Sequence, residues 1–233
     1  MAKLPSKKSD VSVSTIDFEG KKIKLKQFTG REEKVLLTAR LKKDRDSLIN
    51  AVLDIVTSCT DVDARELPIG AVQYLFTEIR SVSHSNVIEF SIACQSCGKA
   101  HPVKIGTHQL NIPEKFTDEL VLDSHHEGSP VKIVLRTPKS KDMFSGTPDD
   151  DNSEIRLIMA CVEEIYVGED LIDEEFTLEE FEAFFMSLKN VYTRALAFVL
   201  DYPKITYENK FKCIECGEDN EVVVKDLKDF FSS

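Results

Sequence analysis

The first third of the chain changes from a strand pattern to a helical one. Residues 11–28 alternate between apolar and polar positions, with Glu19 and Gly20 as a tight turn, and therefore predict a β-hairpin. Thr29 and Glu32 then have the spacing of a helix capping box. Helices are predicted through the apolar positions of residues 35–41, 48–59 and 72–82.

The rest of the chain mixes strand patterns with longer helical ones. Strands are predicted near residues 86–93, 103–105, 119–122, 131–136, 204–212 and 221–224. Helices are predicted at residues 154–166, at 177–200 (with a second capping box, Thr177 and Glu180) and in a closing turn at 225–231. The turn-rich stretch 137–152 should be an exposed loop. The aromatic stripe of Phe181, Phe184 and Phe185 is predicted to be core.

Two segments repeat one pattern around a pair of cysteines. Cys94 and Cys97, and again Cys213 and Cys216, form C-x-x-C-G motifs between predicted strands. Two thiolates at this spacing can hold one cation if the chain turns between them, and the glycine allows the positive φ that such a turn needs. Backbone N–H groups of the turn then point at the sulfurs. Since a closed structural zinc site has four ligands, we expect these cysteines to bind one zinc ion as a zinc ribbon.

The two motifs lie far apart, with the 115 residues 98–212 between them. Closing such a loop costs about 4 kcal/mol plus a constant, whereas structural zinc supplies about 10–16 kcal/mol. The discontinuous ribbon is therefore feasible. Iron accepts the same four thiolates, and a redox pair or disulfides are further alternatives, all less favoured than zinc. Cys59 and Cys161 lie on apolar stripes and are predicted to be core residues.

Composition narrows the class of protein. The 233 residues, 42% of them apolar, fit one large domain or two small ones, and no run reaches the ~20 apolar residues of a membrane span. The first residues lack the apolar stretch of a secretory signal, so we expect a cytosolic protein. The net charge of −11 is unevenly distributed: residues 1–45 carry +7 and residues 149–182 carry −13. Such a chain can attract a second copy or a bipolar partner, although the favoured interpretation is that both segments are ordinary solvated faces.

Other sites are not indicated. Nucleotide-binding, metalloprotease and hydrolase motifs are absent from the sequence. Adjacent His125 and His126 should point to opposite faces of a strand, and Asp149–Asp151 lacks the spacing of a calcium loop. The remaining histidines are expected on the surface, namely His84, His101 and His108.

These patterns predict an α+β fold in which helical segments flank a β-rich zinc-ribbon module assembled from the two distant C-x-x-C-G motifs. The expected parts are a basic tail and hairpin at 1–28, a helical segment at 29–84, a discontinuous ribbon at 85–117 and 203–233, and an insertion at 118–202. The insertion should contain strands followed by an acidic helical segment.

The order of these features resembles a known family. The hairpin F-E-G-K-K-I-K-L-K-Q-F-T is followed by R-E-E-K-V-L-L, and Y-L-F-T-E-I-R-S-V-S at 74–83 comes shortly before Cys94. Over roughly residues 15–225 the chain resembles the baseplate hub assembly protein family of T4-like contractile-tailed bacteriophages. The resemblance carries over the cysteine pairs and the segment around Arg80. The favoured interpretation of Arg80 is a surface helix residue beside Glu78, and the sharper hypothesis is that it pairs with a carboxylate at an interface.

The resemblance implies a non-enzymatic role in building the tail baseplate, as a hub component or as a helper in hub assembly. It implies other hub or tail proteins as partners and assembly in the host cytoplasm, and leaves residence in the virion open. A zinc-ribbon nucleic-acid adaptor is the main alternative, although residues 99–101 and 218–221 do not form a basic face. An enzyme whose site the sequence does not reveal is the other alternative.

Overall fold

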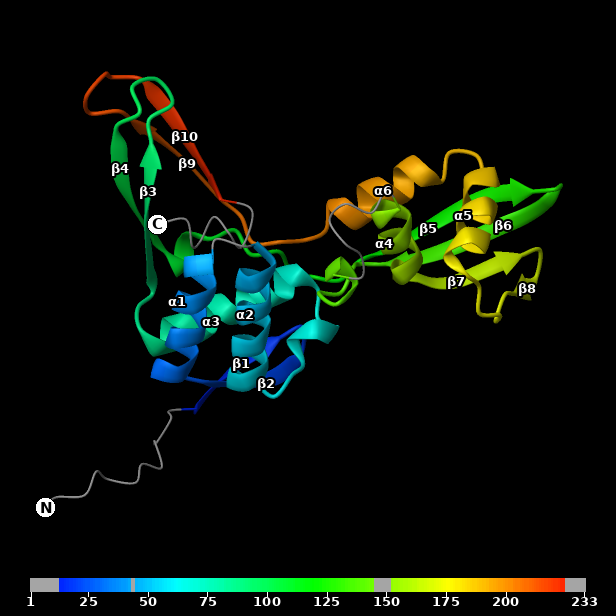
Figure 1. Cartoon of the computed structure of the whole chain (residues 1–233), viewed down its shortest axis with the longest axis horizontal. Coiled ribbons are helices and arrows are strands. Elements are labelled where there is room, and N and C mark those ends of the chain that lie inside the picture. The colour runs from blue at the N-terminus through cyan, green and yellow to red at the C-terminus, as the bar shows by residue number, and fades with distance from the viewer. Residues whose placement is uncertain (1–12, 43–44, 145–151, 225–233) are drawn as a thin grey trace, which may run out of the picture. The chain divides into compact units, whose positions relative to one another are not determined.

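The structure is a computed structural model that describes residues 13–42, 45–144 and 152–224, and it has the predicted mixture of helices and sheets (Figure 1). The chain divides into two compact units, each built from separate stretches of sequence. Unit 1 comprises residues 1–63, 75–110 and 207–233, and unit 2 comprises residues 64–74 and 111–206. None of the helices in the described ranges combines the length and apolar character that crossing a bilayer requires.

Unit 1 begins with the predicted hairpin. β1 (Val13–Phe18) and β2 (Lys21–Lys26) pair antiparallel. Glu19 and Gly20 have φ angles of 49° and 76°, typical of the two-residue turns that match strand twist. Ile23 and Leu25 are buried while the lysines between and beside them are exposed, so the period-two pattern correctly predicted the inward face.

Three helices follow the hairpin, α1 (Gly30–Lys42), α2 (Arg45–Cys59) and α3 (Ile69–Ser83), with a short 3-10 turn, η1 (Ala64–Glu66), before α3. Of these elements, η1 and the first residues of α3, up to residue 74, belong to unit 2. α2 and α3 bury their predicted apolar stripes, including Val52 and Val56 on α2 and Leu75 and Ile79 on α3. α1 packs against α2, but of its residues 30–42 only Ala39 is buried. The apolar positions of α1 are therefore largely outside the core.

Two hairpins complete unit 1. β3 (Val87–Ala93) pairs with β4 (Ala100–Gly106), which runs into the turn η2 (Thr107–Gln109), and β9 (Tyr207–Lys212) pairs with β10 (Asp219–Val224). They form separate two-stranded sheets. Figure 1 shows the hairpins side by side with their turns at the same end. Each turn holds one C-x-x-C-G motif, as the strand–turn–strand pattern predicted.

Unit 2 is an antiparallel sheet with helices on one face (Figure 1). Its strands follow the order β5 (Glu119–His126), β6 (Ser129–Arg136), β7 (Val162–Val167) and β8 (Asp170–Leu171). The helices are α4 (Ser153–Cys161), α5 (Leu178–Ser187) and α6 (Tyr192–Leu200), and the turn η3 (Asp142–Phe144) precedes α4. Apolar side chains of the sheet and the helices form one core, in which Phe181 and Phe185 are buried as predicted.

Two helix predictions in unit 2 are wrong in part. The helix predicted at 154–166 ends at Cys161, because V-E-E-I-Y-V at 162–167 pairs with β6 as strand β7. Its β-branched and aromatic residues suit a strand once a partner strand is available. The helix predicted at 177–200 is divided into α5 and α6, and Asn190 between them has a left-handed φ of 59° that no helix continues through. The exposed loop predicted at 137–152 is wrong over its first part, where Thr137, Ser140 and Asp142 are buried and hydrogen-bonded to other segments. The predictions for residues 145–151 and 225–231 lie outside the described residues.

Candidate metal centre

The turns of the two unit 1 hairpins bring four cysteines together. The Sγ atoms of Cys94, Cys97, Cys213 and Cys216 all lie within 4.8 Å of one another. The Sγ atoms of Cys94 and Cys216 are 3.7 Å apart, and so are those of Cys97 and Cys213. Sulfurs at about 2.3 Å from a tetrahedral zinc ion stand about 3.8 Å from each other, whereas a disulfide bond measures about 2.05 Å. The spacing fits four ligands of one ion rather than two disulfides.

The repeated sequence folds into a repeated structure, a first knuckle (residues 94–98) and a second knuckle (residues 213–217). In both, the N–H of the first cysteine donates to the carbonyl five residues later at 2.8 Å, and the glycine N–H donates back to the carbonyl of that cysteine at 2.9 Å. Gly98 and Gly217 have φ angles of 72° and 75°, the left-handed conformation predicted for them.

Backbone dipoles favour the thiolate form of the first cysteine in each knuckle. The N–H of Cys97 is the main cause that lowers the pKa of Cys94 to about 6, more than offsetting the loss of hydration that raises it. In the same way, the N–H of Cys216 lowers the pKa of Cys213. These N–H groups would offset the negative charge that four thiolates bring to one ion.

The second cysteine of each knuckle has a raised pKa, because its thiolate is disfavoured by desolvation and by the neighbouring sulfurs. The N–H of Lys99 lowers the pKa of Cys97, but desolvation and the neighbouring thiols outweigh it, so this pKa is raised. The N–H of Glu218 likewise lowers the pKa of Cys216, whereas the thiol of Cys213 and the other neighbours raise it to about 12. Four sulfurs this close cannot all be ionised without a cation among them.

Two buried polar side chains support the cluster. His101 and Asn220, each four residues after the second cysteine of a knuckle, are 7% and 4% exposed. The Nε2 atom of His101 lies 3.3 Å from the Sγ of Cys213, and the Nδ2 atom of Asn220 donates to the Sγ of Cys94 at 3.4 Å. The prediction that His101 lies on the surface is wrong, because the opposite hairpin covers it. An alignment of the two C-x-x-C-G motifs in the sequence would have placed these two residues at equivalent positions.

The remaining candidate residues do not join the cluster. Cys59 and Cys161 are buried as predicted, and desolvation raises the pKa of Cys161 to about 12, so it is an inert thiol. His84 and His108 are exposed, as predicted. Burial lowers the pKa of Arg80, and its buried Nε atom has no hydrogen-bond partner among the described residues.

Comparisons with known proteins agree with the pattern of the sequence. A family model described as T4 bacteriophage base plate protein matches residues 7–232. The baseplate hub assembly protein gp26 of Enterobacteria phage T4 is 26% identical over 212 residues, which cover 90% of this chain and 92% of that protein. No solved structure matches the chain at a significant level. These matches confirm the family resemblance that the hairpin, helix and cysteine motifs indicated.

Proposed function

Because the chain belongs to the family of T4 bacteriophage base plate proteins, we propose that it is a non-enzymatic hub component or hub assembly factor of a phage tail baseplate. The observation that carries this proposal is the match over nearly the whole chain, both to the family and to a protein named for hub assembly. Its partners would then be other baseplate hub or tail proteins. Assembly would take place in the host cytoplasm, before or during incorporation into the tail.

The metal in this proposal is a structural zinc ion held by Cys94, Cys97, Cys213 and Cys216. The 3.7 Å sulfur separations and the N–H groups directed at the thiols support four-thiolate ligation. Zinc is favoured over iron because a closed set of four cysteines is typical of structural zinc sites, although both ions fit four thiolates. The ion would join segments 85–117 and 203–233 into one zinc ribbon and so hold the end of the described chain against its middle.

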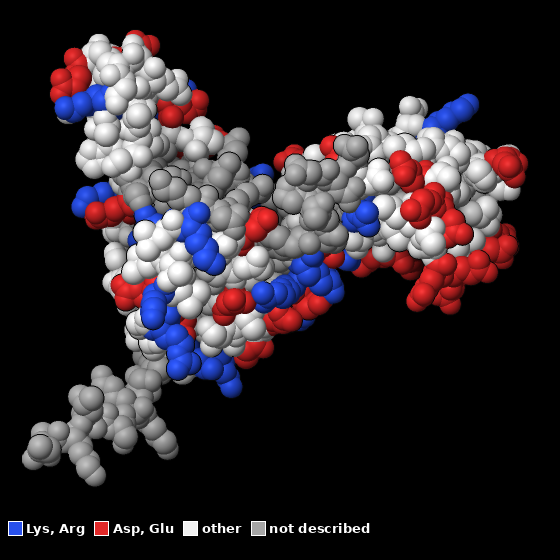
Figure 2. Space-filling view, viewed as in Figure 1, with Lys and Arg blue, Asp and Glu red and all other residues white. Residues whose placement is uncertain are grey.

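A scaffold role suits this site better than catalysis. Four cysteines complete a tetrahedral shell, whereas a catalytic zinc keeps one position open for water or substrate. A nucleic-acid adaptor is less well supported, because Lys99 forms an ion pair with Glu215 across the knuckles at 3.2 Å. Figure 2 shows acidic and basic side chains side by side at the tip of the hairpins, which is not a basic reading face.

The role is tested by co-expressing the tagged chain with the hub proteins of the phage that encodes it. We expect co-purification with at least one hub protein, and mass spectrometry of finished particles then separates a resident component from an assembly factor. Metal analysis should find one zinc ion per chain. A salt-sensitive gel shift with random DNA in place of hub binding would favour the adaptor instead.

A further inference from the structure

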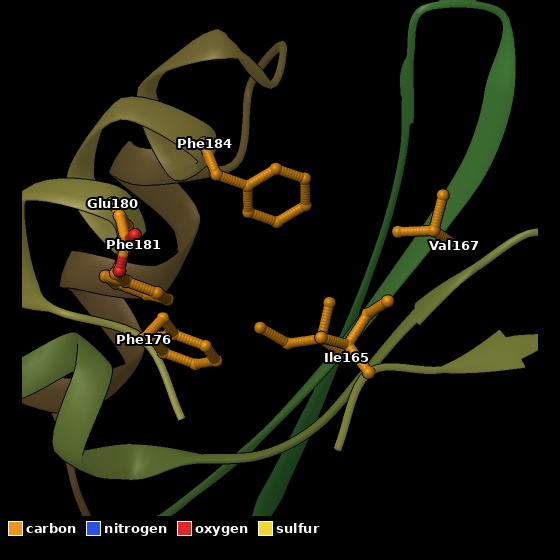
Figure 3. Close-up of a pocket in the computed structure, with 7 residues that line it drawn as sticks. Ile165, Val167, Phe176, Glu180, Phe181 and Phe184 are labelled. Atoms are coloured by element: carbon orange, nitrogen blue, oxygen red, sulfur yellow. The ribbon is translucent and has the colours of Figure 1, made fainter. Parts of the chain in front are cut away.

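Unit 2 contains an apolar cavity that has no part in the cysteine cluster. It is open to the surface and has a volume of about 200 Å³ between β7 and α5. Figure 3 shows Ile165 and Val167 on the strand side, facing Phe176, Phe181 and Phe184 on the helix side. Sites for drug-sized ligands usually measure about 300–1,000 Å³. The cavity is therefore better suited to one or two apolar side chains of a protein than to a cofactor.

The surroundings of the cavity are strongly acidic. Residues 163–182, here called the acidic stretch, contain ten acidic and no basic side chains. Figure 2 shows acidic side chains crowded over β7, β8 and the start of α5. Glu180 lines the cavity and accepts a hydrogen bond from the Thr177 N–H at 2.8 Å, which lowers the pKa of Glu180 and keeps it charged. A suitable occupant is apolar at its tip and basic around it.

Helix α1 of unit 1 has this chemistry. Leu37 and Leu41 are neighbours one turn apart on its surface, and their exposed fractions are 49% and 83%. Exposed Lys34 lies on the same face and exposed Arg31 borders it, while exposed Glu33 lies one turn before Leu37. Figure 2 shows basic side chains over this helix. Two exposed leucines on one helix face, ringed by polar residues, are typical of an interaction surface.

We propose that α1 of one copy docks on the acidic-rimmed cavity of a second copy. The two leucines enter the cavity, and the basic side chains face the acidic stretch. Opposite charges accelerate and orient the encounter, and together with the buried leucines they stabilise the complex. The contact joins two different surfaces, so each copy offers one of each, and copies add head to tail until a ring closes or a filament grows.

This inference extends the proposed assembly role by naming a second copy as a partner, and it does not depend on the metal. Sedimentation velocity of the full chain, with zinc and a reductant present, tests it directly. The average mass should rise with protein concentration. It should fall in about 1 M salt, where the Debye length is only about 3 Å.

Two variants each remove one of the surfaces. Leu41→Asp places an acid on α1, and Ile172→Lys places a cation on the cavity wall at a residue that is 39% exposed. Each should weaken self-association about 30-fold or more, the loss typical of a central interface residue. Leu200→Asp and Val121→Lys are matched controls at 51% and 37% exposure, away from both surfaces, and should associate like the unmodified chain.

An equal mixture of Leu41→Asp and Ile172→Lys gives the sharpest outcome. One variant keeps its cavity and the other keeps its α1, so the mixture should form dimers that grow no further, while each variant alone stays monomeric. The proposal is overturned if the unmodified chain is monomeric at every concentration, if the mixture stays monomeric, or if the controls also lose association. Zinc analysis and hub co-purification on the same samples report separately on the proposed metal and the proposed hub role.

Discussion

His101 and Asn220 occupy the same position in the two knuckles, and each reaches the first cysteine of the opposite knuckle. The contacts measure 3.3 Å from His101 Nε2 to Cys213 Sγ and 3.4 Å from Asn220 Nδ2 to Cys94 Sγ. Asn220 also accepts from the Gln95 N–H at 2.9 Å through its Oδ1 atom. The two hairpins are thus joined reciprocally by polar side chains beside the sulfurs, an arrangement that orients ligands before an ion binds.

Replacing either of these residues by alanine should weaken zinc binding by about 10–100-fold while one ion per chain is still bound. The cause is the loss of a hydrogen bond to a thiolate and of the packing that orients it. Competition with a coloured chelator measures the affinity. His108→Ala, at an exposed histidine, is the control. Unchanged affinity in both variants would mean that these contacts serve packing alone.

Cys213→Ser should remove the metal and lower the melting temperature of unit 1, because the two hairpins lose the ion that joins them. Calorimetry and metal analysis of the same sample measure both effects. Cys161→Ser is the control, since Cys161 is fully buried in unit 2. Its buried hydroxyl should lower stability without loss of the metal. A melting curve that a chelator leaves unchanged would argue against a structural ion.

Zinc binding at pH 7 should release at least about two protons per ion. The pKa of Cys94 is lowered to about 6, so this thiol is mostly ionised, whereas the pKa of Cys97 is raised and that of Cys216 is raised to about 12. Both of these must deprotonate to become ligands. Affinity should therefore fall as the pH falls, and more steeply below about pH 6 as Cys94 also takes up a proton.

Isothermal titration in buffers of different ionisation enthalpy measures this proton release, because the apparent binding enthalpy then changes in proportion to the protons taken up by the buffer. Cys59→Ser is a suitable control, as Cys59 lies outside the cluster. An enthalpy that is the same in every buffer would show that the four sulfurs do not all bind as thiolates.

The sequence predicted those parts of the fold that are fixed locally. Period-two alternation with Glu19-Gly20 identified the first hairpin, and the glycine after each cysteine pair identified the knuckle turns, because backbone conformation at these positions depends on near neighbours. The four metal-ligand candidates followed from the repetition of one motif rather than from any long-range pattern.

Features that depend on distant partners were not predictable. V-E-E-I-Y-V at 162–167 continues a helical stripe as well as it makes a strand, and only its pairing with β6 decides. The burial of His101 requires the second hairpin. The leucines of α1 show the same limit, since an apolar stripe indicates a surface that avoids water but does not tell whether the same chain covers it.

Reversing the charges of Glu174 and Glu175 to lysine should slow association with any basic partner surface and flatten its dependence on salt. The fold should keep its stability within about 0.5 kcal/mol, since both side chains are exposed. Glu180 is left intact, because its carboxylate caps α5 and its loss would destabilise the start of that helix. Biosensor kinetics at several salt concentrations give the association rate.

Glu114 and Asp201 provide the matched control for this double reversal. They are exposed acids of unit 2 outside the acidic stretch, so their replacement by lysine changes the net charge by the same amount. If both double variants slow association equally, total charge rather than this surface controls the encounter. If neither does, the acidic stretch serves solubility.

Arg136 and Asp142 form a largely buried ion pair, and Asp142→Ala should destabilise unit 2 by about 2–3 kcal/mol. Arg136 Nη1 lies 2.7 Å from Asp142 Oδ2, and its Nη2 donates to the Ala160 carbonyl at 2.6 Å, which joins β6 to α4. The Asp142 side chain is 6% exposed, but that of Arg136 is 21% exposed. Solvent therefore relieves part of the ~3–5 kcal/mol expected when a buried charge loses its partner.

Urea unfolding measures this loss of stability. Two further variants separate the effect of the charge from that of the hydrogen bonds. Lys104→Ala breaks an exposed pair with Glu89, in which the side chains are 67% and 61% exposed, and should cost no more than about 1 kcal/mol. Asp142→Asn keeps an acceptor for the Lys139 N–H, which donates to Asp142 at 2.8 Å, but removes the charge. A large loss in Asp142→Asn would make the charge decisive. Stability retained there but lost in Asp142→Ala would instead assign the effect to the hydrogen bonds that Asp142 accepts.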